Sequence, residues 1–351
     1  MELMDMIKVG VLGATGYAGI ETVRLLLRRS DVKIERVVSK SFAGKKLDEI
    51  YPNFLGAFDI VCSDLDVDDI AESCDLVFTA LPHGASKTII PELYERGLKI
   101  IDLSGDFRYD DPKVYEAWYG EPHSAPELLK EAVYGLCELH RGEIAKSRLI
   151  GNPGCYTTCS ILGLAPAVKA GILDNSSIII DAKSGVTGAG RGTSIPNLYS
   201  EVNESVKAYK IATHRHTSEI EQELSKLAGE EIKLSFTPHL VPLQRGIFST
   251  EYANLTKDVS ADELYKIYCE FYEGEEFVKV YEPGRLPELK HVRGSNYAGI
   301  GFVIDERLKR LIVVSCIDNL VKGAAGQAIQ NMNIVCGLEE NTGLTDIGTY
   351  L

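Results

Sequence analysis

Short apolar runs alternate with amphipathic stretches over the first half of the chain. The run IKVGVL at 7–12 has the composition of a buried strand, and after a glycine-rich turn apolar residues recur at helical spacing. A second apolar run follows at 32–38. Further strands are expected at 76–81 and 98–103, with a helix at 84–97 between them. This alternation predicts an α/β domain with a parallel, doubly wound sheet of the Rossmann type.

The pattern changes after Gly151. Strands are expected near 177–183, 232–238, 247–256, 299–304 and 311–317, and helices at 157–170, 217–227, 261–272 and 322–336. The long β segments predict a second, α+β domain with a mixed or antiparallel sheet. We therefore expect a first domain at 1–154, a second at 155–317, and a C-terminal segment at 318–351 whose helix returns to the first domain.

Amino-acid composition indicates which kinds of molecule the protein is unsuited to bind. The 351 residues include 51 acidic and 37 basic side chains, a formal charge of −14, which repels nucleic-acid phosphates and anionic lipid. No stretch approaches the roughly 20 apolar residues that span a bilayer. The N-terminus lacks the basic and apolar regions of a leader, and the eight cysteines show no paired CxxC spacing. We expect a cytoplasmic protein with reduced thiols and a small-molecule substrate, acting on neither nucleic acid nor membrane.

The turn GATGYAG, with glycines at 13, 16 and 19, lies between a strand and a helix. Glycines at this spacing permit positive φ and let the backbone approach a phosphate at the helix N-terminus. A glycine-rich turn without a ligand is the alternative. The strand–helix–strand context favours a dinucleotide site.

The end of the second strand indicates which dinucleotide binds. It reads Val38-Ser39-Lys40-Ser41, without the carboxylate that an NAD site usually carries for the ribose 2′-hydroxyl. Two hydroxyls and an ammonium, with Lys45 and Lys46 nearby, could instead accept a 2′-phosphate. The prediction is NADP rather than NAD, and an ordinary solvated loop is the alternative.

Cys155 lies in GNPGCYTT at 151–158, where the first pattern ends and a long helix begins. At a helix N-terminus, backbone N–H groups and the macrodipole stabilise a thiolate and lower the thiol pKa from about 8.5. The other cysteines, including Cys159 one turn later, are expected to be small buried hydrophobes. Cys155 is therefore the candidate nucleophile.

Two histidines flank an arginine in HRHTSEIE at 214–221. Ser218 and Glu221 have capping-box spacing, which places both histidines just before a helix. In an extended backbone, His214 and His216 would face one pocket, one exchanging protons and the other binding substrate. A zinc site lacks a third ligand at recognisable spacing, so we predict no metal; a surface pair without a role is the other alternative.

Three loops carry arginines that could clamp an anionic substrate. Arg191 ends the glycine-rich loop SGVTGAGR at 184–191, Arg108 ends DLSGDFR at 102–108, and Arg245 lies in PHLVPLQRG at 238–246. A single arginine is more often a solvated charge, but a ligand anion in so acidic a protein needs a local cation.

These motifs together resemble the N-acetyl-gamma-glutamyl-phosphate reductases (type 1), distant relatives of the aspartate-semialdehyde and glyceraldehyde-3-phosphate dehydrogenases. The resemblance covers nearly the whole chain and rests on seven motifs in family order, GATGYAG, LPHGAS at 81–86, DLSGDFR, GNPGCYTT, SGVTGAGR, HRHTSEI and DNLVKGAAGQAIQNMN at 318–333. This sequence has Thr187 where many relatives have Ser, and Ser218 where many have Pro. Neither difference removes a reacting group.

The resemblance implies roles for individual residues. Cys155 would be the nucleophile and His214 its acid–base partner. The residues implied to lie near the substrate are Arg108, Arg191, His216 and Glu219, to which we add Arg245. The cofactor positions are Gly13, Thr15, Gly16, Tyr17, Ser39, Leu81, Pro82 and Asn319, to which we add Lys40, Ser184 and Gly185.

The implied reaction is NADPH-dependent reduction of an N-acetylglutamyl phosphate through a cysteine thioester, in arginine biosynthesis. One alternative is a homologue of lysine biosynthesis that reduces a carrier-bound aminoadipyl or glutamyl phosphate. Another is an NADP-binding regulator without catalysis. The family implies a homodimer or homotetramer.

Overall fold

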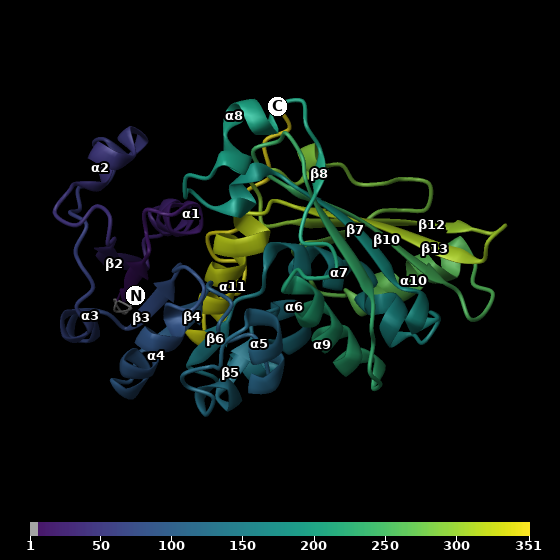
Figure 1. The fold of residues 1–351 in the computed structure, drawn as a ribbon, viewed down its shortest axis with the longest axis horizontal. Coiled ribbons are helices and arrows are strands. Elements are labelled where there is room, and N and C mark those ends of the chain that lie inside the picture. Colours follow the sequence, from purple (N-terminus) through teal and green to yellow (C-terminus); the bar gives the residue numbers. More distant parts are fainter. Residues whose placement is uncertain (1–5) are drawn as a thin grey trace. The chain divides into compact units, whose positions relative to one another are not determined.

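The computed structural model describes residues 6–351. The prediction that the chain lacks a leader rests partly on residues 1–5, which lie outside the described residues. The chain forms two compact units (Figure 1). Unit 1 contains the residues up to Pro153 together with Ala324–Thr345, and unit 2 contains Gly154–Gly323 with Asp346–Leu351. The C-terminal segment 318–351 is therefore shared between the units: residues 324–345 belong to unit 1, and residues 318–323 and 346–351 belong to unit 2.

Unit 1 is built on a six-stranded sheet in which every pairing is parallel, in the order β2-β1-β3-β4-β6-β5. Its strands are β1 (Ile7–Leu12), β2 (Val32–Val38), β3 (Leu76–Thr79), β4 (Lys99–Asp102), β5 (Ala132–Tyr134) and β6 (Leu149–Gly151). The order reverses direction beside β1, as in a doubly wound sheet. The predicted parallel sheet is confirmed.

The helices of unit 1 begin where local chemistry favours a start. The Asp66 side chain accepts from two first-turn amides of α3, and Asp111 precedes Pro112 at the start of α5. The helices are α1 (Tyr17–Leu26), α2 (Leu47–Ile50), α3 (Val67–Ser73), α4 (Ser86–Glu95), α5 (Pro112–Tyr119), α6 (Cys137–Ile144) and α11 (Gly326–Val335). Figure 1 shows α11 in yellow beside the blue strand β4, which it contacts.

Unit 2 contains a seven-stranded mixed sheet in the order β11-β12-β13-β10-β7-β9-β8. Its strands are β7 (Ile179–Ser184), β8 (Lys207–Ala208), β9 (Ser235–Leu240), β10 (Ile247–Asn254), β11 (Val278–Val280), β12 (Ala298–Asp305) and β13 (Arg310–Ile317). Side chains of β10 are alternately buried and half-buried, so one face of the sheet is covered within the unit. The predicted mixed sheet is confirmed.

Helix α7 (Cys155–Lys169) is the central helix of unit 2 and contacts β10, β13 and the helices α9 (His216–Ala228) and α10 (Ala261–Phe271). Residues 156–168 are all buried, which accounts for a sequence that is apolar on every side. Pro166 lacks an amide hydrogen and leaves the Leu162 carbonyl without its helical donor. The hydroxyl of Tyr272 donates to this carbonyl at 2.5 Å.

The predicted helix at 322–336 is shorter than expected. Residues Val321–Ala325 form a π turn, and α11 starts only at Gly326. The chain passes from unit 2 to unit 1 inside this turn, between Gly323 and Ala324. The remaining short helix, α8, spans Tyr199–Val202. Of the helices between residues 6 and 351, none has both the length and the apolar character that crossing a bilayer requires.

Candidate active site

The glycine-rich turn of unit 1 has the geometry of an anion site. Gly13 has φ +77°, and a Cβ there would overlap the carbonyl oxygen of Ala80 and lie 3.3 Å from Leu81. Gly16 is the N-cap of α1, and none of the side chains of residues 6–351 caps this helix end. First-turn amides at an uncapped N-terminus can bind phosphate oxygens, so these residues fit a dinucleotide pyrophosphate.

The end of β2 meets the same turn. The hydroxyls of Thr15 and Ser39 form a hydrogen bond of 2.7 Å in a buried position, so the end of β2 and the glycine-rich turn are joined there. Tyr51 donates its hydroxyl to the Thr15 carbonyl at 2.8 Å, a support that the sequence did not indicate. Lys46 pairs with Asp59 at 2.9 Å, whereas Lys40 is exposed beside Ser39. Lys40 is therefore better placed for a phosphate than Lys46.

In unit 2, Cys155 is the first residue of α7, two residues earlier than the helix was predicted to begin, and it is partly buried. The Glu219 carboxylate accepts from the Gly154 amide at 2.9 Å and from the Thr157 hydroxyl at 2.7 Å. Glu219 is 1% exposed. A carboxylate bound at a helix N-terminus is favoured by the macrodipole, so Glu219 holds the turn that presents the thiol.

The histidine pair is close together for a different reason from the one predicted. Helix α9 starts at His216 itself, and its N-cap Arg215 has helical φ and ψ and makes no side-chain cap bond. The predicted capping box of Ser218 and Glu221 is therefore wrong, and the backbone at 214–216 is a turn rather than extended. The His214 and His216 rings still lie 4.7 Å apart.

The two rings face the nucleophile's helix. A Cβ on Gly154 would overlap the His216 ring and lie 2.7 Å from its Cε1 atom, so only glycine leaves room for this ring beside Cys155. The His216 amide donates to Nδ1 of His214 at 3.1 Å. Nδ1 is thus an acceptor, and Nε2 of His214 carries the proton in the neutral ring. No three His, Cys, Asp or Glu side chains between residues 6 and 351 are arranged to hold a metal ion.

An aromatic cage that the sequence did not indicate surrounds His214. Tyr156, Tyr209 and Phe236 contact the ring edge to face, with centroids 5.8, 5.6 and 5.5 Å away. Tyr209 donates to the Tyr156 hydroxyl at 3.2 Å, and Tyr156 donates to the His239 carbonyl at 3.0 Å. Burial raises the pKa of Tyr209 to about 12 and that of Tyr156 still further. Both phenols stay neutral and hold the imidazole in a largely apolar setting.

The two loops at 184–192 and 241–246 contact each other. Asn319 accepts from the Gly246 amide at 2.7 Å and donates to the Thr187 hydroxyl at 2.9 Å. Arg245 forms an ion pair with buried Asp318 at 3.0 Å, so its charge is already balanced. Arg191 lies exposed on the first loop.

Two more predicted residues, Ser184 and Arg108, are buried and bonded to backbone carbonyls, which limits their reach. Ser184 is buried, and its hydroxyl donates to the Gly185 carbonyl at 2.8 Å. Arg108, in unit 1, is 5% exposed and donates from Nε to the Asn152 carbonyl at 2.7 Å and from Nη2 to the Leu103 carbonyl at 3.2 Å. The guanidinium of Arg108 thus supports the backbone just before the cysteine turn.

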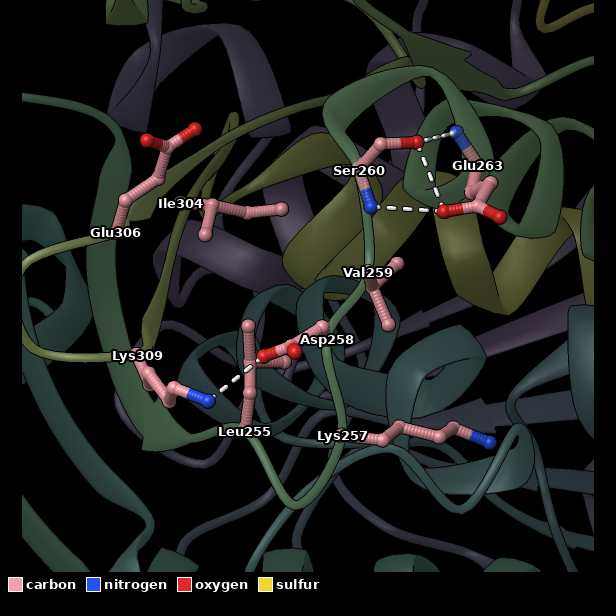
Figure 2. Close-up of a pocket in the computed structure, with 9 residues that line it drawn as sticks. All are labelled: Leu255, Lys257, Asp258, Val259, Ser260, Glu263, Ile304, Glu306 and Lys309. Atoms are coloured by element: carbon pink, nitrogen blue, oxygen red, sulfur yellow. Dashed lines mark hydrogen bonds and ion pairs between the residues drawn. The ribbon is translucent and has the colours of Figure 1, made fainter.

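A separate hollow of unit 2 contains none of the predicted site residues (Figure 2). It lies where β10 ends and α10 begins, against the β12–β13 turn. Figure 2 shows Lys309 paired with Asp258 at 2.8 Å and Ser260 in a capping box with Glu263. Ser260 and Glu263 thus cap α10, and Lys309 and Asp258 balance each other's charge.

Comparison with known proteins identifies the family. Residues 8–147 match the family described as semialdehyde dehydrogenase, NAD binding domain, and residues 155–319 match semialdehyde dehydrogenase, dimerisation domain. The chain is 56% identical to N-acetyl-gamma-glutamyl-phosphate reductase of Acetivibrio thermocellus, over 99% of this chain and 100% of that protein. The chain belongs to this reductase family. The enzyme of the same name from Geobacter metallireducens is 53% identical, over 98% and 100% of the two chains. The predicted resemblance is confirmed.

Solved structures of lower identity share the fold. Aspartate semialdehyde dehydrogenase II from Vibrio cholerae superposes with a TM-score of 0.73 at 16% identity, over 95% of this chain and 99% of that one. The Candida albicans aspartate semialdehyde dehydrogenase, solved with NADP, gives a TM-score of 0.69 at 19% identity, over 95% and 99%. The chain therefore has the semialdehyde dehydrogenase fold, a nucleotide-binding domain followed by a mixed-sheet domain.

Proposed function

We propose that this member of the reductase family converts N-acetyl-L-glutamyl 5-phosphate to N-acetyl-L-glutamate 5-semialdehyde and phosphate, with oxidation of NADPH, in arginine biosynthesis. The observation that carries the proposal is Cys155 at the first position of α7, with the His216 ring against the preceding Gly154 and the His214 ring 4.7 Å from that of His216. Relatives at 51–56% identity are named for this activity.

The chain's own groups account for the covalent steps. The Cys155 thiolate attacks the acyl carbon, the carbon–oxygen bond to phosphate breaks, and a thioester forms with release of phosphate. NADPH, when bound, supplies the hydride that reduces the thioester carbon. His214 takes the proton of the Cys155 thiol as the thiolate forms, and the resulting imidazolium donates a proton to the former carbonyl oxygen. When the thiohemiacetal collapses, that proton returns to His214, the carbon–sulfur bond breaks, and the thiolate is regenerated as the semialdehyde leaves.

The decisive assay runs the reaction in reverse. Wild-type protein should reduce NADP with N-acetylglutamate semialdehyde only when phosphate or arsenate is present, and Cys155→Ser should abolish this turnover. Cys159→Ser is the matched control, because Cys159 is fully buried one turn later and its burial raises the thiol pKa well above the usual value. An active Cys155→Ser variant would eliminate the thioester mechanism.

Arg108, Arg191, His216, Glu219 and Arg245 remain our proposed substrate residues. The structure supports two ways of acting. Glu219 and Arg108 bond the backbone on either side of Pro153, so they would act by shaping the cysteine turn. Arg191 is exposed on a glycine-rich loop and is the cation best able to reach a substrate anion.

We propose NADP rather than NAD as the cofactor. The paired hydroxyls of Thr15 and Ser39, with exposed Lys40, suit a 2′-phosphate. A Ser39→Asp variant should lose efficiency with NADPH and retain it with NADH, because the new carboxylate repels the phosphate and can bind a 2′-hydroxyl. Ser41→Asp adds the same charge at an exposed position nearby and should change the preference less. Equal kcat/KM values for the two cofactors in wild-type protein would contradict the assignment.

The free amino acid, rather than a carrier-bound one, is our proposed substrate. The formal charge of −14 disfavours docking of an acidic carrier protein. Turnover should be measured with free N-acetylglutamyl phosphate and with carrier-bound glutamyl or aminoadipyl phosphate at matched concentrations. Activity with the carrier-bound substrate alone would reverse the choice. NADPH binding without any turnover would favour the regulator.

We propose that the chain forms a homodimer through the outer face of the unit 2 sheet, alone or within a tetramer. Ile179, Tyr252, Ile312 and Val303 pair in register across β7, β10, β13 and β12, and Ile179 and Val303 are 46% and 45% exposed. Such an apolar row suits a second copy, and the matched family describes this region as a dimerisation domain.

Light scattering tests the assembly. Val303→Glu should yield monomers, whereas Leu308→Glu, on the exposed β12–β13 turn outside the row, should not. An unchanged mass for Val303→Glu would place the interface elsewhere.

We also propose a cytoplasmic location, because all eight cysteines are free thiols and the proposed reaction depends on one of them.

A further inference from the structure

The chain passes between the two units beside the proposed nucleophile. It leaves unit 1 after Pro153 and returns to unit 1 at Ala324. Asn152, 1% exposed, lies one residue before the first crossing, and its Nδ2 atom donates to the Ala324 carbonyl at 3.2 Å. One side-chain amide therefore joins the first two of the chain's three crossings, on the side of unit 1.

Every other polar group of Asn152 is also bonded within unit 1. Its amide donates to the Asp102 carbonyl at 2.8 Å, and its carbonyl accepts from Nε of Arg108 at 2.7 Å. Its Oδ1 atom accepts from Nδ2 of Asn331, on α11, at 3.0 Å. Four hydrogen bonds, two to residues 102–108 and two to residues 324–331, fix the position and the rotamer of this residue.

On the unit 2 side, the returning segment lies against the nucleophile. A Cβ on Gly323 would lie 2.7 Å from the Cβ of Cys155 and 3.1 Å from its Cα. Gly323 donates its amide to the Asp318 carbonyl at 2.9 Å inside the π turn. The thiol-bearing residue thus packs directly on backbone one residue before Ala324.

We propose that Asn152 is a positioning residue for Cys155. By joining Ala324 to the segment that leads into α7, it keeps Gly323 packed on Cys155 and holds the thiol at the helix N-terminus, where the amides stabilise the thiolate. This inference rests on the proposed thioester chemistry and adds a residue that touches neither substrate nor cofactor. A purely structural asparagine would affect stability without affecting the thiol.

The test compares Asn152→Ser with Asn333→Ser. Asn333 is a matched control because it is fully buried on α11 and its amide donates to the Glu340 and Thr342 carbonyls, away from the crossings at Pro153 and Ala324. Alkylation of Cys155 by iodoacetamide is followed by peptide mass spectrometry from pH 5 to 10. Thermal unfolding, NADPH affinity and kcat are measured on the same samples.

We expect both variants to unfold at lower temperature and to keep their NADPH affinity. Only Asn152→Ser should move the pH midpoint of Cys155 alkylation upward, toward the about 8.5 of a free cysteine. Its kcat should fall roughly tenfold, as for a misplaced reacting group. The midpoint decides the proposal: a wild-type midpoint in Asn152→Ser, or an equal shift in Asn333→Ser, overturns it.

If Asn152→Ser does not fold, Asn152→Asp and Asn333→Asp replace the pair. Asp keeps the oxygen that accepts from Asn331, and on ionisation it loses the donor to Ala324 and gains a negative charge. The deciding measurement is then the alkylation rate on the alkaline plateau, where the added charge no longer affects thiol ionisation. That rate should rise in Asn152→Asp alone, and an unchanged rate overturns the proposal. Because alkylation needs no substrate, an inactive wild-type enzyme would instead count against the proposed function.

Discussion

A buried carboxyl group beneath the nucleophile's helix makes stability depend on pH. Glu251, at the centre of β10, is fully buried, and its Oε1 atom accepts from the Ser315 hydroxyl at 2.9 Å. Its Oε2 atom has no hydrogen-bond partner among residues 6–351 and lies against Gly163 of α7. Burial raises the pKa of Glu251 to about 8 from its ordinary 4.5.

The sign of the effect follows from proton binding in the two states. Below pH 4.5 the carboxyl is protonated whether the chain is folded or unfolded. Between pH 4.5 and about 8 only the folded state keeps the proton, so the free energy of unfolding falls with pH by about 1.36 kcal/mol per unit. The total loss is about 5 kcal/mol, an upper limit because water entry or local relaxation would reduce the pKa shift.

Glu251→Gln removes the titration while keeping a similar shape and the acceptor for Ser315. Hydrogen exchange of the α7 and β10 amides measures the free energy of opening in unit 2 from pH 5 to 9, after correction for the intrinsic exchange rate. Trp118, the sole tryptophan, lies in unit 1, and its fluorescence during urea unfolding is an internal control. As the pH rises, protection of the α7 amides from hydrogen exchange should decline in the wild type relative to Glu251→Gln. The urea unfolding midpoints reported by Trp118 fluorescence should depend on pH in the same way in both proteins.

The wild type and Glu251→Gln should differ by several kcal/mol more at pH 9 than at pH 5, with the difference levelling off above pH 8. Parallel pH dependences would refute the reasoning. They would mean that the folded-state carboxyl titrates near its ordinary pKa and is not held neutral by burial.

Three further substitutions test the packing around α7. Gly163→Ala should destabilise the protein by about 1–3 kcal/mol in urea unfolding, because the new Cβ would overlap the Glu251 carboxylate. Alanine in place of glycine usually stabilises a helix, so a stabilised variant would contradict the packing. Tyr272→Phe should cost about 1–2 kcal/mol, since an α7 carbonyl loses its donor, and a neutral result would show that water replaces it. Gly154→Ala should lower kcat while leaving NADPH affinity unchanged, because a Cβ there displaces the His216 ring; full activity would show that the ring is not needed in that position.

Local pattern was enough to predict the elements that frame the site. The predicted strands at 7–12 and 32–38 have the bounds of β1 and β2, because each is a short apolar run bounded by turn residues. The placement of Cys155 at the start of a helix followed from Pro153 and Gly154 in front of an apolar stretch. Signals of this kind involve neighbours in sequence and need no knowledge of tertiary packing.

Contacts between distant segments could not be predicted in this way. The bond from Glu219 to the Gly154 amide joins residues 65 apart, and the bond from Asn152 to Ala324 joins residues 172 apart. The exposed cysteine is a further example, since Cys269 was expected to be buried like most cysteines and lies on the outer side of α10. The residues next to Glu219 and Asn152 in sequence do not indicate their hydrogen-bond partners, and those next to Cys269 do not indicate its exposure.

Strand β10 shows most clearly how an alternating pattern can mislead. Its alternation of Phe248 and Tyr252 with Ser249 and Glu251 would predict that the aromatic side faces the core. The structure has the opposite arrangement, with Glu251 turned toward α7 and the aromatic residues half-buried on the outer face. The small and polar side makes room for a helix that packs closely through Gly163. The aromatic side is explained if a second copy covers it, as the proposed dimer requires, so the apparent inversion in β10 itself supports the assembly.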